Sequence, residues 1–322
     1  MHPFLTLFTQ RPVYFDGAMG TRLQALGLAG GEPPERWNLT HPDDVKGVYL
    51  SYLRAGADVV TANTFGANPL HYPDEWERVL AAGIRLAREA VAQAGRTAWV
   101  AMDSGSVGKL LQPLGELAFE DAVTIYRDMA RAGIAAGCDL LLAETMTDLR
   151  EVKAAVLGYR EAFAETGAQL PVLVSMSFDV NGRLLTGADI EGAAALLTSM
   201  EGVDALGMNC GREPAALLPN LKRLLACAGG KPVFFMPNAS VPTIVDGRTV
   251  CHPAGGICAG HGGGAQAGRL RAGRLLRHNG GAHCGVGCGH AYAFTRGQPP
   301  VRRRGRAGPR VRFRPQRHRG AG

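Results

Sequence analysis

The feature that most constrains this chain is the alternation, through its first 250 residues, of short apolar runs with longer amphipathic segments. The apolar runs are continuous, which is typical of parallel strands buried on both faces of a sheet. The longer segments carry apolar residues at helical spacing, and several open on Asp, Thr or Pro, as helices commonly do. The strand-like runs occupy residues 13–15, 58–60, 98–102, 140–143, 172–176, 205–208 and 233–236, and the helix-like segments occupy 43–54, 74–93, 119–136, 148–165, 189–200 and 213–227.

Seven strands with intervening helices in about 240 residues predict an α/β fold of the (β/α)8, or TIM-barrel, type. The alternative is an open, doubly wound sheet, but no Gly-x-Gly-x-x-Gly sequence follows the first strand, where that fold often carries one. The eighth strand is missing where it is due, after Val250. We therefore expect residues 1–250 to form one barrel domain that lacks its last βα repeat.

Composition changes abruptly at residue 251. All 28 Asp and Glu lie in residues 1–250, whereas residues 251–322 hold 14 Arg, no acid and 18 of the 44 Gly. So few apolar residues cannot offset the entropy lost on ordering, and this predicts a disordered basic tail. Such a tail suggests an alternative function, a non-enzymatic protein that binds nucleic acid. Phe313 is the one aromatic residue interleaved with the arginines of 301–306 and 310–319, too little aromatic surface for base stacking, so nucleic acid is not the favoured partner.

The sequence shows no recognisable targeting signal. The chain does not open on a basic stretch followed by a sustained apolar run, and no apolar run approaches the roughly 20 residues of a membrane helix. Seven cysteines without an export signal are expected to be reduced thiols. We expect a cytoplasmic protein with no membrane partner.

Each predicted strand is followed by a polar residue at its carboxyl end, and in a barrel these ends meet at one mouth. Helix capping explains any one such position about equally well, and it is the better explanation for Asp103, which precedes a glycine-rich loop. Together the positions indicate a site. An unrelated barrel transferase or lyase would need a phosphate or Schiff-base site, and no predicted strand ends on a lysine. The positions are Asp16, Asn63, Asp103, Glu144, Ser177, Cys210 and Asn238.

Motifs at these strand ends resemble those of homocysteine S-methyltransferases, most closely the homocysteine-binding domain of cobalamin-dependent methionine synthases. The resemblance runs in order from residue 12 to residue 250, with departures at Ser104, Ser106 and Ser240. The motifs are Asp-Gly-Ala-Met-Gly-Thr at 16–21, Ala-Asn-Thr-Phe-Gly at 62–66, Gly-Lys-Leu-Leu-Gln-Pro-Leu-Gly at 108–115, Glu-Thr-Met-Thr-Asp at 144–148, Gly-Met-Asn-Cys at 207–210 and Pro-Asn-Ala at 237–239.

This resemblance implies an enzyme that transfers a methyl group to the thiolate of homocysteine and forms methionine. It implies that Asp16 and Glu144 bind the substrate's ammonium group. It further implies neutral hydrogen bonds around the substrate carboxylate, or behind the groups that contact it. The residues for that role are Asn63, Thr64, Ser177 and Asn238.

The resemblance also implies a zinc ion that is held by three cysteines and binds the substrate's sulfur at its open position. Cys210 matches one ligand. The other two are adjacent in the family motif Gly-Gly-Cys-Cys-Gly-Thr-Thr, and this chain contains no adjacent cysteines. Residues 109–115 resemble the cobalamin-dependent branch, yet no corrinoid-binding module follows. A methylated corrinoid on another protein is the expected methyl donor and partner.

The missing motif is present in another reading frame. One permitted set of codons for Arg274–Cys284, read one base later, spells Gly-Cys-Cys-Gly-Thr-Thr-Ala-Glu-His-Ile. The same shift lets His252–Cys258 read Thr-Pro-Pro-Glu-Glu-Tyr-Ala, a proper helix opening. Each shifted position admits only about a fifth of residue types, so a match of this length arises by chance on the order of once in a million. We therefore interpret residues 251–322 as out of frame, and we expect impaired zinc binding and activity.

Overall fold

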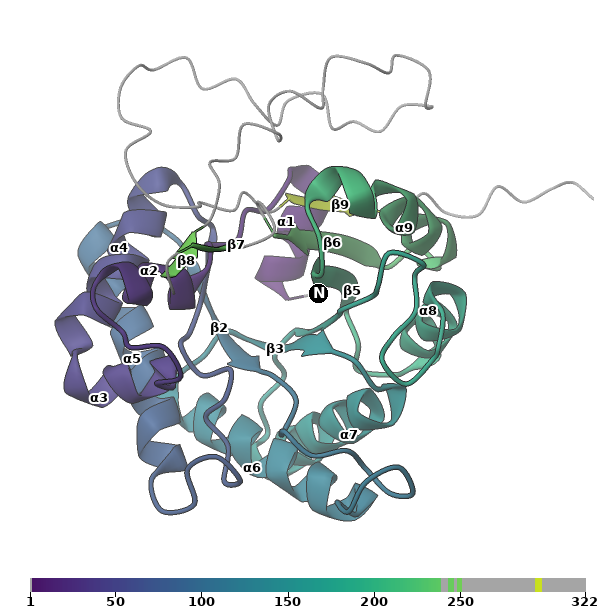
Figure 1. The fold of residues 1–322 in the computed structure, drawn as a ribbon, viewed down its shortest axis with the longest axis horizontal. Helices are drawn as coiled ribbons and strands as arrows, with labels where there is room; N and C mark the ends of the chain where they lie inside the picture. Colours follow the sequence, from purple (N-terminus) through teal and green to yellow (C-terminus); the bar gives the residue numbers. More distant parts are fainter. Residues whose placement is uncertain (1, 239–242, 246–247, 251–292, 297–322) are drawn as a thin grey trace, which may run out of the picture.

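The computed structural model describes residues 2–238, 243–245, 248–250 and 293–296, and these form a curled, mainly parallel sheet surrounded by helices (Figure 1). The sheet order is β1-β2-β3-β4-β5-β6-β9, and β1 to β6 pair in parallel, each with the next along the chain. This confirms the α/β class and gives a partial barrel rather than an open doubly wound sheet. The parallel strands are β1 (Val59–Thr61), β2 (Trp99–Ser104), β3 (Leu140–Met146), β4 (Val172–Met176), β5 (Ala205–Cys210) and β6 (Pro232–Pro237).

The predicted helices all form within two residues of their expected ends. Asp148 and Asp189 each accept a backbone N–H at the start of a helix, and Pro42 and Pro214 occupy first helical positions. These helices are α4 (Pro42–Ala55), α5 (Trp76–Ala94), α6 (Phe119–Ala136), α7 (Leu149–Thr166), α8 (Ile190–Ser199) and α9 (Pro214–Cys227). Four short elements were not predicted: α1 (Pro3–Gln10), α2 (Met19–Ala25), the 3-10 helix η1 (Pro34–Arg36) and α3 (Trp37–Thr40).

The first predicted strand, residues 13–15, is reduced to a single parallel bridge between Phe15 and Val59. Val59 donates a hydrogen bond to Tyr14 O at 3.1 Å, and Asp16 donates to Val59 O at 2.9 Å. Within the described residues this segment pairs only with β1, so it has half the ladder that holds the inner strands. It still sets the position of Asp16 beside β1.

The far edge of the sheet differs from the sequence prediction. β9 (Ala293–Arg296) pairs antiparallel with β6, where a closed barrel would place a parallel strand. An unpaired strand edge offers a row of hydrogen-bonding groups to any extended segment within reach. Residues 293–296 belong to the segment 251–322, which was predicted to be disordered, and the rest of that segment lies outside the described residues. A two-stranded hairpin, β7 (Thr243–Val245) with β8 (Arg248–Val250), lies before it in the chain.

The barrel interior is closed at the amino ends of the strands by α1, and Figure 1 shows the N-terminus in the middle of the ring. Phe4 and Phe8 of α1 pack edge to face, with ring centroids 5.1 Å apart, and Phe4 also contacts Trp99 at the start of β2. These rings join the inward-facing residues of every parallel strand in one apolar cluster. The opposite, carboxyl ends of the strands are where the interior turns polar.

A Gly-x-Asp sequence precedes every second strand and aligns the strand starts. Asp58, Asp139 and Asp204 accept the N–H groups of Tyr14, Val100 and Val172 at 3.0, 2.7 and 2.9 Å. Each Gly two residues earlier lies in the left-handed region, with φ of 106°, 88° and 90°. Each Asp carboxylate bonds to the first residues of the preceding strand. It therefore aligns neighbouring strands so that their C-terminal ends lie level at the mouth.

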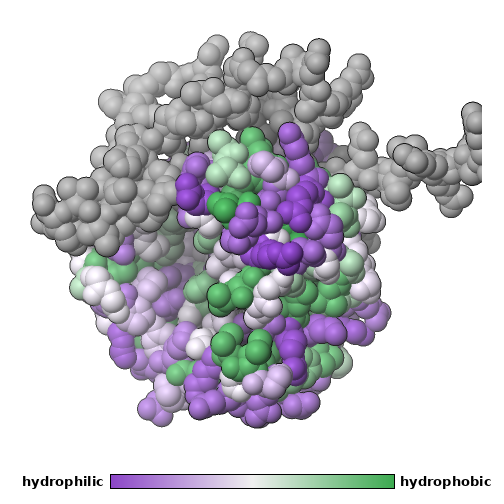
Figure 2. Space-filling view, turned by 45° about the vertical axis from the view of Figure 1, so that its right-hand side comes forward, coloured by the Kyte–Doolittle hydropathy of each residue, from purple (hydrophilic) through white to green (hydrophobic). Residues whose placement is uncertain are grey.

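The surface carries no single dominant apolar patch in the view of Figure 2, where apolar residues are scattered among hydrophilic ones. Of the described large apolar side chains, Leu185 and Leu114 are the most exposed, at 77% and 68%, and both lie on loops that follow strand ends. None of the described helices has the length and apolar character needed to cross a membrane.

Candidate active site

The site lies inside the mouth, directly above the apolar interior. Side chains alternate along a strand, so the residue two places beyond an inward-facing one also faces inward. Asp103, Glu144 and Ser175 follow the interior residues Ala101, Leu142 and Leu173 in this way. The structure thus brings polar groups from successive strands to one level.

Asp16 is the first acid of the site and is 4% exposed. Its two carboxylate oxygens accept hydrogen bonds from Thr61, one from the side-chain hydroxyl at 2.7 Å and one from the backbone N–H at 2.9 Å. Burial nevertheless raises the pKa of Asp16 to about 8, because removing the charged form from water costs more than these two bonds return. The nearby Glu144 raises it further.

Asp103 faces Glu144 across β2 and β3, and it is 5% exposed. No N–H or O–H group of the described residues donates to Asp103 Oδ1. The pair can therefore hydrogen bond only if one carboxyl group is protonated. Burial first, and then the charge of Glu144, raise the pKa of Asp103 well above its usual value. Burial also raises the pKa of Glu144, and its contact with the Asp103 carboxyl group opposes that rise.

Asn209 connects these acids to Cys210. Its amide Nδ2 donates to Thr145 Oγ1 at 2.6 Å, to Cys210 Sγ at 3.3 Å and to Glu144 Oε1 at 3.3 Å. Its Oδ1 accepts from the hydroxyl of Ser175 at 2.6 Å and from the backbone N–H of Thr145 at 3.2 Å. One buried amide thus fixes a carboxylate and a thiol relative to each other.

Thr145 and Cys210 both have a φ of 57°, the left-handed region that side chains with a Cβ seldom adopt. The β3–β4 pairing shifts register between Ala143 and Met146, so the strand bulges where Glu144 and Thr145 lie. Such conformations cost about 1–3 kcal/mol each and cluster at functional sites. Here they turn Thr145 Oγ1 and Cys210 Sγ toward each other, 3.8 Å apart.

The described residues do not form a zinc site by themselves. No group of three His, Cys, Asp or Glu with metal-binding spacing occurs among them, and Cys210 is the sole cysteine of the mouth that the structure describes. Burial, and then the charge of Glu144, raise the pKa of the Cys210 thiol, so the free thiol is protonated at neutral pH. One neutral thiol falls short of the three protein ligands that a catalytic zinc requires.

The four neutral residues predicted to form hydrogen bonds near the substrate carboxylate lie in different surroundings. Asn63 Nδ2 donates to Pro34 O and Asn38 Oδ1, both at 2.8 Å, and Thr64 Oγ1 donates to Asp103 O at 2.8 Å. These two side chains form hydrogen bonds that connect the segments around the buried acids. Ser177 is half-buried, and its backbone N–H donates to Met146 O at 3.0 Å. Asn238 is half-buried immediately after β6.

Sequence reasoning missed three members of the site. Asp103 was attributed to capping, but its side chain lies in the mouth against Glu144. Ser175 and Asn209 were passed over because the last polar residue of each strand was chosen. Counting forward in steps of two from the interior residues Leu173 and Ala205 reaches Ser175 and Asn209.

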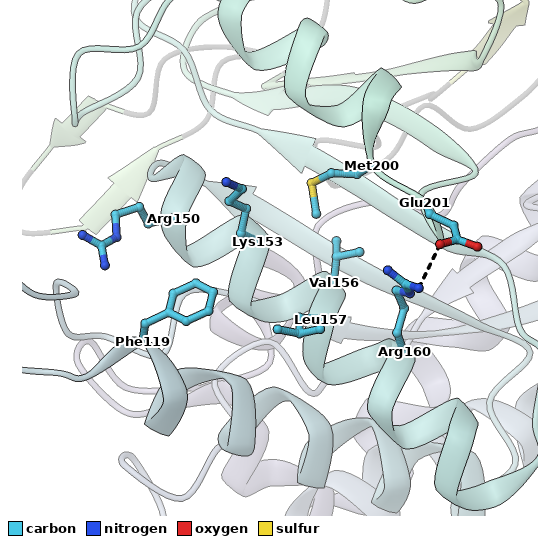
Figure 3. Close-up of a pocket in the computed structure, with 8 residues that line it drawn as sticks. All are labelled: Phe119, Arg150, Lys153, Val156, Leu157, Arg160, Met200 and Glu201. Carbon is cyan, nitrogen blue, oxygen red and sulfur yellow. Dashed lines mark hydrogen bonds and ion pairs between the residues drawn. The ribbon is translucent and has the colours of Figure 1, made fainter.

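A separate groove of about 470 Å³ lies on the outer wall (Figure 3). It runs along α7, near the start of α6 and the end of α8. Arg160 there pairs with Glu201 at 2.9 Å. The groove contains none of the mouth residues, so the acids and Cys210, rather than this hollow, define the candidate site. Its lining is Phe119, Arg150, Lys153, Val156, Leu157, Arg160, Met200 and Glu201.

Comparison with known proteins identifies the class. The family model described as homocysteine S-methyltransferase matches residues 13–261, which end within the segment interpreted as out of frame. The chain belongs to the homocysteine S-methyltransferase family, a family of methyltransferases.

Among its relatives are the methionine synthases of Mycobacterium tuberculosis (strain H37Rv) and Mycobacterium leprae, each 34% identical, over 256 and 255 residues. The matches cover 74% of this chain but 21% of each relative, so the chain spans about one fifth of their length.

Solved structures agree on the fold. The metallated form of the homocysteine methyltransferase MmuM from Escherichia coli matches with a TM-score of 0.62 and 24% identity, covering 74% of this chain and 87% of that one. The apo form of the same enzyme matches with a TM-score of 0.57 and 26% identity, covering 72% and 84%. The partial barrel described above is therefore the fold of this family.

Proposed function

We propose that this barrel binds homocysteine and that its family reaction is methyl transfer to the homocysteine sulfur, which yields methionine. The observation that carries the proposal is the Asn209 amide, which lies 3.3 Å from both Glu144 Oε1 and Cys210 Sγ. One end of this arrangement suits an ammonium group and the other suits sulfur chemistry. Homocysteine carries both groups on one short chain.

The ammonium end is favoured by charge. Asp16, Asp103 and Glu144 lie together in the mouth, and none forms an ion pair with a Lys or Arg of the described residues. Buried acids without a cation are unfavourable until a positive ligand arrives. We assign Asp16 and Glu144 to direct contact with the ammonium group. Ser177 and Asn238 are proposed to bind the carboxylate, while Asn63 and Thr64 hold the surrounding loops.

Cys210 is the one residue of this sequence that we assign to the proposed zinc site. The family resemblance assigns it as one of three ligands, and the two adjacent cysteines are absent from this sequence. We propose that they are encoded in the shifted frame of the same gene, and that the chain as it stands binds zinc poorly and has little activity.

The methyl donor is proposed to be a methylated corrinoid on another protein. Support comes from the relatives, which are methionine synthases of which this chain spans about one fifth. The cytoplasm is the proposed compartment, because the reduced Cys210 thiol that the site requires is maintained there.

Ligand binding to the full-length chain tests the core of the proposal. We expect L-homocysteine to bind about 10- to 100-fold more tightly than 4-mercaptobutyrate, which lacks the amino group, because hydrogen bonds to charged groups contribute about 1.5–3 kcal/mol. Glu144→Gln should abolish most of this difference. Asp121→Asn, an exposed change on α6, is the control. Equal affinity for the two compounds would contradict the assignment of the acids.

The frame proposal has its own tests. Metal analysis of the purified chain should give far less than one zinc per chain, and one tightly bound zinc would contradict the predicted impairment. DNA covering codons 245–285 should spell an adjacent cysteine pair when read one base later. A gene corrected by that base should gain zinc and methyltransferase activity together.

A further inference from the structure

The Asp103–Glu144 pair differs from the other buried carboxyl groups of this protein. Glu151, for example, is 3% exposed and accepts three hydrogen bonds, from Ser106 Oγ, Val107 N and the hydroxyl of Tyr126. Asp103 Oδ1 has no such donor, although it is fully enclosed. A buried carboxyl oxygen without a donor is energetically unfavourable. Its neighbour is a second carboxyl group.

We infer that Asp103 and Glu144 hold one proton between them, and that the ammonium group of a bound amino acid displaces this proton, which makes Asp103 a third ammonium-binding residue of the mouth. The inference rests on the proposed function for the choice of an amino acid as ligand. Before binding, a carboxylic acid at Asp103 donates to the carboxylate of Glu144. After binding, two carboxylates accept from the ammonium N–H groups, and the released proton goes to solvent.

The charge around the pair favours this exchange. The ionisable groups that interact with it are Asp16 beside β1, Glu35 of η1, Tyr49 of α4, Tyr159 of α7 and Cys210 at the end of β5. None of these groups is a base that can become cationic, so a second negative charge on the pair is unfavourable in the empty mouth. A primary ammonium ion supplies the compensating charge and up to three donors. A ligand without that charge leaves the proton in place.

The backbone contacts hold the pair in position for this role. Thr64 Oγ1 donates to Asp103 O at 2.8 Å and accepts from Asp103 N at 3.1 Å, so the residue is fixed on both sides of its side chain. Glu144 is fixed from the other side by Asn209 at 3.3 Å. These contacts fix the backbone of Asp103 and one carboxylate oxygen of Glu144.

The test is calorimetry of the full-length chain with L-methionine, a stable amino acid without a thiol. Titrations near pH 7 in phosphate and in Tris give the number of protons released, because the two buffers differ in ionisation enthalpy. Asp103→Asn retains a donor toward Glu144 but carries no proton to release. We expect this variant to release about one proton fewer per ligand than the wild-type chain. Asp121→Asn should leave the number unchanged.

An unchanged proton number in Asp103→Asn overturns the inference, even if the affinity falls, since a merely structural residue would alter affinity alone. Infrared spectra of the ligand-free chain supply a second readout. The band of protonated carboxyl groups near pH 7 should weaken in Asp103→Asn, and an unaltered band also overturns the inference. If L-methionine does not bind at all, the proposed function is contradicted, and so is displacement of the proton by a ligand. A weaker carboxyl band in Asp103→Asn would still support a proton shared by Asp103 and Glu144 in that case.

Discussion

Replacement of Asp139 by Ala should destabilise the barrel by about 2–4 kcal/mol, because two charged hydrogen bonds at the start of β3 are lost together. Asp139 Oδ2 accepts the N–H of Val100 at 2.7 Å, and Oδ1 accepts from Arg88 Nη2 at 2.7 Å. The bond to the backbone N–H of Val100 dominates, at about 1.5–3 kcal/mol, because a buried backbone donor that loses its charged acceptor is costly. The half-exposed Arg88 pair adds about 0–1 kcal/mol.

The assay is equilibrium unfolding in urea, in which Asp139→Ala should lower the midpoint and leave the slope unchanged. Asp139→Asn keeps one acceptor oxygen and should lose about half as much. The matched control is Asp43→Ala, which removes an ion pair with Lys46 at 3.4 Å from a side chain that is 94% exposed, and should stay within about 0.5 kcal/mol. Equal losses in Asp139→Ala and Asp43→Ala would refute the strand-aligning role of the Gly-x-Asp sequences.

Three further outcomes follow from other contacts. Since the pKa of Asp16 is raised to about 8, the folded chain binds more protons there than the unfolded chain, and stability should fall as the pH rises from about 4 to 8; Asp16→Asn should flatten this dependence in urea midpoints measured across that range. Gly207→Ala places a Cβ 2.6 Å from the Phe234 ring and should lower stability by about 1–3 kcal/mol in thermal unfolding, whereas Gly20→Ala, with open space at its Cβ, should have no cost of this kind. Lys231→Met removes donors to the carbonyl groups of Leu197, Met200 and Val203, at 2.9, 3.1 and 2.7 Å, and should increase amide hydrogen exchange at the end of α8, with little change at α4.

The order of strands and helices could be predicted because it depends on local sequence patterns. Each helix from α4 to α9 has an apolar face at helical spacing, and most have a clear start or stop signal, such as Asp148 before α7 or the left-handed Gly137 after α6. The helix α1 was missed because its residues carry no start signal stronger than His2 and Pro3. Its burial depends on the barrel that it closes, which no local pattern describes.

The candidate site could be predicted only in outline. Motif resemblance singled out Asp16, Glu144 and Cys210, and all three lie in the mouth. It could not show that Asp103 faces Glu144, because the contact depends on the register between β2 and β3 and on the curvature of the sheet. For the same reason Asn209 looked like one residue of a motif, although it joins two functional groups.

The sequence by itself determined which residues form strands and helices, and which polar residues stand at the strand ends, since both depend on side-chain spacing along one segment. Only the tertiary structure decided which of those polar groups meet, and in which state of protonation. That decision requires strands to curve around a common axis, so that carboxyl groups 41 positions apart in the chain, at Asp103 and Glu144, are enclosed together away from water. Their burial, rather than their identity, turns two ordinary acids into a pair that shares a proton.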